Sequence, residues 1–126
     1  MATPTTQETV TVGSREVRLL LPNSFAIRHE VVGCAAHNAA RAFAAALAFC
    51  WSGPGRPKAV YTRHNCNPLQ YGGAVVDELR GRGVDMAEII EAGGRAFTLI
   101  ADSLITASEV DTVEGFTEGQ VGPLTS

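Results

Sequence analysis

The side chains best suited to metal binding or nucleophilic catalysis are the cysteines and histidines. Cys34 and His37 lie one helical turn apart, and one residue separates His64 from Cys66. Structural zinc sites usually draw paired ligands from two places, and the chain contains no Cys-x-x-Cys. A Cys66 thiolate beside His64 would be activated, but no third residue is identifiable to orient the pair. We therefore expect no metal, no cofactor and no catalytic site, with Cys34 and Cys50 as buried, reduced spacers.

Carboxylates and paired glycines have structural explanations. Asp77-Glu78 and Glu88 with Glu91 fall in predicted helices, where a charged outer face or the helix N-terminus accounts for them. Gly72-Gly73 and Gly93-Gly94 lack both a preceding strand and the G-x-G-x-x-G spacing of a phosphate-binding loop. The sequence therefore indicates no acid–base pair, and the glycines predict close helix crossings.

A basic segment follows the most apolar part of the chain. It carries Arg56, Lys58, Tyr61 and Arg63, and Trp51 precedes it. Cations interleaved with an aromatic ring can contact phosphates or an acidic protein surface. The net charge of the whole chain is −3, whereas nucleic-acid binding usually needs a larger basic footprint. We expect a protein contact or a solvated loop here; Trp51 either closes the core or, if exposed, anchors an interface.

Charge is unevenly distributed along the chain. Residues 1–63 carry seven Lys/Arg and three Asp/Glu, whereas residues 64–126 carry three and ten. This polarity is compatible with two halves that pack on each other, with ordinary solvated faces, or with copies that dock head to tail.

Strict alternation predicts a β-hairpin over residues 8–21, turning at Gly13-Ser14 and preceded by an extended arm at residues 1–7. Its apolar side chains are Val10, Val12, Val17 and Leu19. A two-stranded ribbon is marginal alone, so this face must pack on helices or join a sheet supplied by another subunit. In the second case the four residues form an interface.

Helical periodicity accounts for most of the remaining chain. An apolar stripe follows Ser24, an Asn67-Pro68 start is typical of a helix cap, and Thr106 with Glu109 has the form of a capping box. A break at Gly33 is left open, and residues 117–126 are expected to be a flexible tail. The predicted helices span about 24–51, 67–81, 86–104 and 107–115.

These elements form one predicted domain over residues 8–116 of the 126-residue chain. Its fold class is mainly α, a four-helix-type small domain with an N-terminal β-hairpin, or α+β by strict count. No stretch is long and apolar enough to span a membrane, and the N-terminus lacks the basic and apolar regions of a secretory signal. We expect the chain to stay in the cytoplasm unless an assembly carries it out.

Several segments resemble small proteins encoded among the tail genes of tailed bacteriophages. They are Tyr71–Leu79 (YGGAVVDEL), Arg82–Val84, Glu88–Gly93 and Ser108–Val110, and the resemblance covers about residues 8–118. It is a resemblance to tail assembly chaperones, which implies a short ribbon, a helical body and binding of tape-measure or tail-tube protein. The long basic Gly-Pro loop at 53–66 and the absence of a recognisable slippery-site continuation depart from that family.

The leading hypothesis is a non-enzymatic bacteriophage assembly or structural protein that forms homo-oligomers or joins a larger assembly. The alternatives are a permanent virion component of the head, connector or tail, and a small nucleic-acid-binding or regulatory module that uses Arg41 and the basic loop 56–64. The interface residues that we predict are Val10, Val12, Val17, Leu19, Trp51, Arg56, Lys58, Tyr61 and Arg63.

Overall fold

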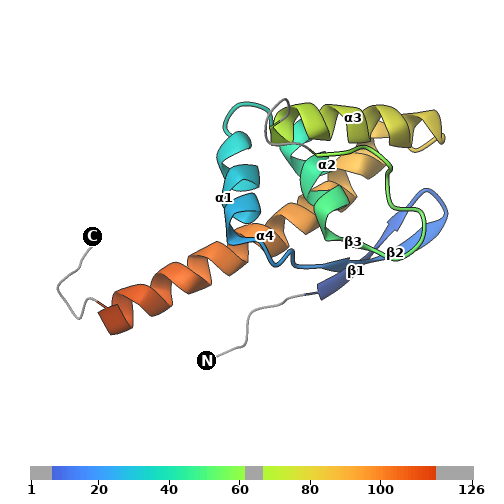
Figure 1. Cartoon of the computed structure of the whole chain (residues 1–126). Helices are drawn as coiled ribbons and strands as arrows, with labels where there is room; N and C mark the ends of the chain where they lie inside the picture. Colours follow the sequence, from blue (N-terminus) through green and yellow to red (C-terminus); the bar gives the residue numbers. More distant parts are fainter. Residues whose placement is uncertain (1–6, 62–66, 116–126) are drawn as a thin grey trace.

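The computed structural model describes residues 7–61 and 67–115 and places four helices around a small antiparallel sheet (Figure 1). The elements are β1 Gln7–Val12, β2 Arg15–Leu20, α1 Phe25–Cys34, α2 Ala39–Cys50, β3 Trp51–Ser52, α3 Pro68–Gly81 and α4 Met86–Gly115. The prediction of a mainly helical α+β domain with an N-terminal hairpin is confirmed. The predicted arm and tail lie outside the described residues, except for Gln7, which begins β1.

The hairpin turns at Gly13, whose φ of 65° is the left-handed geometry that a two-residue hairpin turn requires. Val12 pairs with Arg15 and Val10 with Val17. Because side chains alternate along a strand, Glu8, Val10 and Val12 face one side of the ribbon and the threonines between them face the other.

A third strand, β3, was not predicted. Leu19 pairs with Trp51, and Arg18 pairs with Ser52. The predicted helix therefore ends one residue early, because Trp51 takes an extended conformation (φ −63°, ψ 121°) that lets it join the sheet. In the strand order β1-β2-β3, β2 is central and β1 is an edge.

The segment predicted at 24–51 is two helices, and the break does not fall at Gly33. Gly33 remains inside α1, and the chain turns over residues 35–38 instead. The cause is Asn38, whose side chain accepts a hydrogen bond from the Arg41 amide (3.0 Å) and so caps a new helix. Ser24 caps α1 in the same way through the Ile27 amide (3.2 Å).

The segments predicted at 86–104 and 107–115 form one helix, α4, so the predicted break is wrong. The linking residues Leu104–Ala107 contain neither glycine nor proline, and nothing in them interrupts backbone hydrogen bonding. At 30 residues, α4 is about 45 Å long, since a helix rises about 1.5 Å per residue. Among the described elements no other helix exceeds 14 residues, and α4 extends well past the body (Figure 1).

The centre of the core is α2, which is crossed by α3 and α4. Five of its alanines are completely buried: Ala42, Ala44, Ala45, Ala46 and Ala48. A Cβ at Gly72 would overlap the Arg41 carbonyl, and one at Gly93 would lie 2.6 Å from the Phe43 carbonyl oxygen. The close helix crossings predicted from the glycine pairs are therefore confirmed.

Candidate interaction surface

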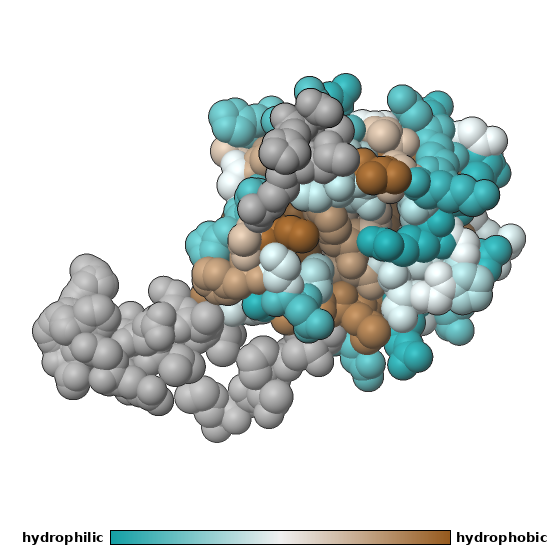
Figure 2. All heavy atoms as spheres, in the orientation of Figure 1, coloured by the Kyte–Doolittle hydropathy of each residue, from teal (hydrophilic) through white to brown (hydrophobic). Residues whose placement is uncertain are grey.

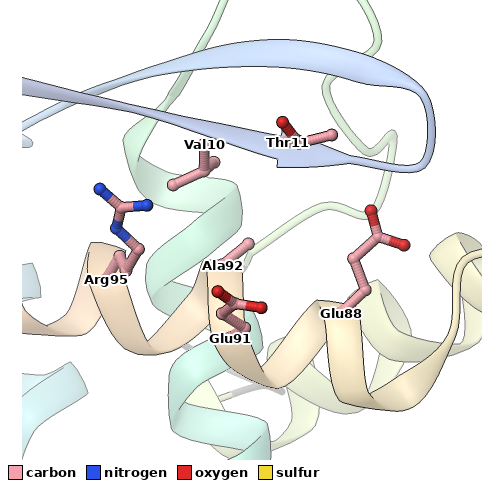
Figure 3. A pocket seen from close by; sticks show the side chains of 6 residues that line it. All are labelled: Val10, Thr11, Glu88, Glu91, Ala92 and Arg95. Carbon is pink, nitrogen blue, oxygen red and sulfur yellow. The ribbon is translucent and has the colours of Figure 1, made fainter.

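The outer edge of β1 borders a groove above α4. A hollow of about 330 Å³ lies there, lined by Val10, Thr11, Glu88, Glu91, Ala92 and Arg95. Figure 3 shows Val10 directed towards α4, and Arg95 and Glu88 directed from α4 towards the strand. Arg95 forms an ion pair with Glu8 of β1, which ties the strand to the helix. Within the described residues, no strand pairs with β1 on this side.

The groove carries a net negative charge. Glu8 and Arg95 neutralise each other, whereas Glu88 and Glu91 form no ion pair or hydrogen bond with the described part of the chain. Two unpaired carboxylates beside an open strand edge favour an extended segment that carries lysine or arginine.

The four apolar hairpin residues that we predicted as an interface are part of the core. Val10, Val12, Val17 and Leu19 are exposed by 5% or less and belong to the same buried cluster as the helices. The hairpin therefore takes the first of the two predicted arrangements, in which its apolar face packs on the chain's own helices. Their side chains are almost fully buried in this fold, so a contact through the sheet would have to use its edge.

Trp51 closes the core and is not an exposed anchor. It is 5% exposed, and its indole N–H donates a hydrogen bond to the Pro54 carbonyl (3.1 Å). The alternative that placed it at an interface is wrong, because its extended backbone turns the ring inward as part of β3.

The basic loop is held against the body by its own hydrogen bonds. Arg56 donates from Nε to the Ala48 carbonyl (3.0 Å), and the Lys58 amide donates to both carboxylate oxygens of Glu78 (2.9 and 2.7 Å). These bonds from the Lys58 amide are the main reason why the pKa of Glu78 is lowered. The Lys58 residue itself is exposed, and Arg63 lies outside the described residues.

The Tyr61 side chain makes contacts within its own chain. Its hydroxyl donates to Glu30 (2.5 Å), and its ring packs edge-on against Phe49 and Tyr71, with centroids 5.2 and 5.6 Å away. Burial raises the pKa of the Tyr71 hydroxyl. This aromatic cluster fastens the end of the loop over α2 and α3.

Sequence reasoning missed a second hollow, of about 450 Å³, at the end of the molecule that holds the hairpin turn. Arg15 and Arg82 line it together with Trp51 and Leu79. Both arginines meet Gly55: Arg82 donates to its carbonyl (2.6 Å), and a Cβ there would lie 2.7 Å from Nε of Arg15. Hydrophilic residues cover this end of the face drawn in Figure 2. This hollow could not be found from the sequence, because no motif connects residues as far apart in the chain as Arg15 and Arg82.

A third surface exposes apolar side chains where α4 leaves the body. Phe25 is 52% and Ile105 is 58% exposed. Arg28 lies over the Phe25 ring and donates to Ser103 (3.1 Å), which places the start of α1 beside this part of α4. Exposed aromatic and aliphatic groups of this size are suited to protein contacts.

The described cysteines lie in apolar or half-buried surroundings. Cys50 is 1% exposed, which confirms that it is buried, and burial raises the pKa of its thiol to about 12. Cys34, which was also predicted to be buried, is only half-buried, and burial raises the pKa of its thiol as well. His64 and Cys66 lie outside the described residues. Among the residues that are described, no three His, Cys, Asp or Glu side chains group as metal ligands would.

Comparison with known proteins finds no family model, no curated protein and no solved structure that matches this chain. In the described part of the chain, no helix combines the length and the apolar character needed to cross a membrane.

Proposed function

We propose that this chain is a non-enzymatic bacteriophage assembly protein of the tail assembly chaperone type, which acts through protein–protein contacts. The observation that supports this most is the open edge of β1 beside its acidic groove. An edge strand presents unpaired backbone groups, which form a template for a strand from another chain. The groove beside it gives room for the side chains of the added strand.

The register identifies the backbone groups that a partner would use. In an antiparallel ribbon, hydrogen-bonded pairs alternate with pairs whose polar backbone groups point away from each other. A two-residue turn makes Val12 and Arg15 a hydrogen-bonded pair, so alternation assigns the outward-pointing groups to Thr9 and Thr11. Both threonines have exposed side chains, so substitutions there do not disturb the core.

The charge of the groove and the exposed apolar side chains indicate what kind of partner would bind. Glu88 and Glu91 favour an extended segment with basic side chains. Phe25 and Ile105 would add apolar contacts to a larger subunit. A tape-measure or tail-tube subunit that exposes such a segment before assembly fits this description.

Native mass spectrometry of the chain with the tape-measure and tail-tube proteins of the same phage tests the proposal. We expect a complex that Thr11→Pro weakens about tenfold, because removal of an outward amide costs about 1.4 kcal/mol of hydrogen bonding. Thr11→Val keeps the amide and is the matched control. Both variants should retain the circular dichroism spectrum of the native chain, since proline is tolerated on an edge strand whose amide faces outward.

Two results would contradict the proposal. The first is the absence of any complex with either protein. The second is equal binding by Thr11→Pro and Thr11→Val, which would exclude strand addition at β1. If the chain is instead retained in purified virions at a fixed copy number, it is a permanent virion component.

A further inference from the structure

The helix α4 runs antiparallel to β1 beneath the open edge of the sheet. At one end, Val84, two residues before α4, lies beside the hairpin turn: a Cβ on Gly13 would lie 3.6 Å from Cγ2 of Val84. At the other end, Arg95 of α4 forms its ion pair with Glu8 near the start of β1. The groove therefore has a fixed direction, and each groove-facing residue of β1 lies above a defined part of α4.

The negative charge is confined to one half of this groove. The residues of α4 that line it are spaced three and four apart and so form one stripe: Glu88, Glu91, Ala92 and Arg95. Because a helix rises about 1.5 Å per residue, Glu91 lies about 6 Å and Glu88 about 10 Å from Arg95, towards the hairpin turn. Arg95 is neutralised by Glu8, so the net charge of the groove comes from the two glutamates nearer the turn.

This arrangement defines the side chains of an added strand. Such a strand would lie about 4.8 Å outside β1, with its side chains alternating between the two faces of the sheet. The residue opposite Val10 would point towards α4, as Val10 itself does (Figure 3), and would lie near Glu91. Two positions along, the residue opposite Val12 would point the same way, near Glu88. The groove is therefore complementary to two basic residues separated by one residue of any type.

A second copy of this chain does not fit the same edge. The helix α4 packs against β1, whereas α2 packs against β2. If two copies paired β1 with β1 about a two-fold axis, their α4 helices would lie on the same face of the joined sheet, only about 5 Å apart. Packed helices need about 8–10 Å between their axes. The added strand must therefore have no helix beneath it.

We infer that the β1 edge takes an extended segment of a different protein, in which two lysine or arginine residues are separated by one residue. This inference rests on the strand addition that is part of the proposed function, and it defines the sequence pattern of the partner. Backbone hydrogen bonds to β1 hold the segment, and Glu88 with Glu91 select its charge pattern.

Two labelled threonine-rich peptides of identical composition test the pattern by fluorescence anisotropy at low ionic strength. One has a single threonine between its two lysines, and the other has two, which directs the lysines to opposite faces of a strand. We expect the first to bind at least about fivefold more tightly, as two partly exposed ion pairs allow. Glu88→Gln/Glu91→Gln should abolish this preference. Asp77→Asn/Asp102→Asn is the matched control, because it changes the net charge equally at exposed positions outside the groove.

Equal binding of the two peptides, or binding of neither, would overturn the inference. So would a preference that survives the double glutamine variant. Sedimentation velocity of the chain alone tests the other occupant: a dimer that Thr11→Pro dissociates would show that a second copy takes the edge. A complex with a phage protein that is weakened by Thr11→Pro, without any preference between the peptides, would refute the inference but support the proposed function. The expected preference without binding of either phage protein would have the opposite meaning.

Discussion

Replacement of Gly93 by alanine should destabilise the domain, whereas the same replacement at the adjacent Gly94 should stabilise it. Both residues lie inside α4, but they face α2 differently. A Cβ at Gly93 would lie 2.6 Å from the oxygen and 2.8 Å from the carbon of the Phe43 carbonyl, which is rigid backbone. A Cβ at Gly94 would lie 3.7 Å from Cε2 of the Phe43 ring, which is ordinary van der Waals contact.

The expected magnitude follows from two opposing effects. Alanine is more favourable than glycine in a helix interior by about 1 kcal/mol, and this gain applies equally to both positions. At Gly93 the two helices must separate by nearly 1 Å to restore normal contact, and overpacking of this kind costs about 1–3 kcal/mol. The helix propensity cancels in the comparison, so the two variants should differ by about 1–3 kcal/mol in free energy of unfolding.

Urea unfolding followed by far-UV circular dichroism measures this difference directly. The midpoint should fall below that of the native chain for Gly93→Ala and rise above it for Gly94→Ala, with equal denaturant slopes. A rise of the midpoint at both positions would show that α2 and α4 are not in backbone contact at this crossing. A similar fall at both positions would instead mean that Phe43 cannot tolerate any added group on α4. Either result would contradict the prediction.

Two further predictions concern titratable groups. The lowered pKa of Glu78 stabilises the fold above its ordinary pKa of 4.5, and this stabilisation is lost as the pH falls through the lower folded-state pKa. Glu78→Gln should therefore lower the unfolding midpoint at neutral pH but have much less effect in acid; a pH-independent loss would contradict this. Cys50 should not react with a water-soluble maleimide at pH 8 until the chain unfolds, because burial raises the pKa of its thiol to about 12. Peptide mapping measures the labelling, and labelling of Cys50 in the folded chain would refute the prediction.

The residues that determine local structure can be identified from the sequence. The alternation around Gly13 predicts the hairpin and its turn, and Asn67-Pro68 predicts the start of α3. Both signals act within a few residues, where backbone sterics and side-chain capping decide the conformation. The same kind of signal was misjudged at Asn38, whose cap starts α2, because the apolar stripe continues across the break without changing phase.

Features that depend on contacts between distant segments were not predictable in this way. The Glu8–Arg95 ion pair joins residues 87 positions apart, and Arg15 and Arg82 both lie beside Gly55. A single sequence contains the charges of such a site but not their separation in space. Five of the predicted interface residues have buried side chains: Val10, Val12, Val17, Leu19 and Trp51. The contact predicted for the basic loop stays a prediction.

The alternation along the hairpin shows that Val10 and Val17 must be covered by other residues, but it does not identify those residues. The small side chains of α2 make it possible for helices of the same chain to cover them. Because α3 and α4 approach α2 so closely, the sheet can lie on α2 and α4 together and bury its apolar face within one chain. In the described part of the chain, the surfaces left for partners include the backbone edge of β1 and the arginines at the end that holds the hairpin turn. Specificity in a contact at the β1 edge rests on strand register, so substitutions at the exposed Thr11 should change binding without disturbing the core, whereas substitutions at the buried Val17 should destabilise the domain.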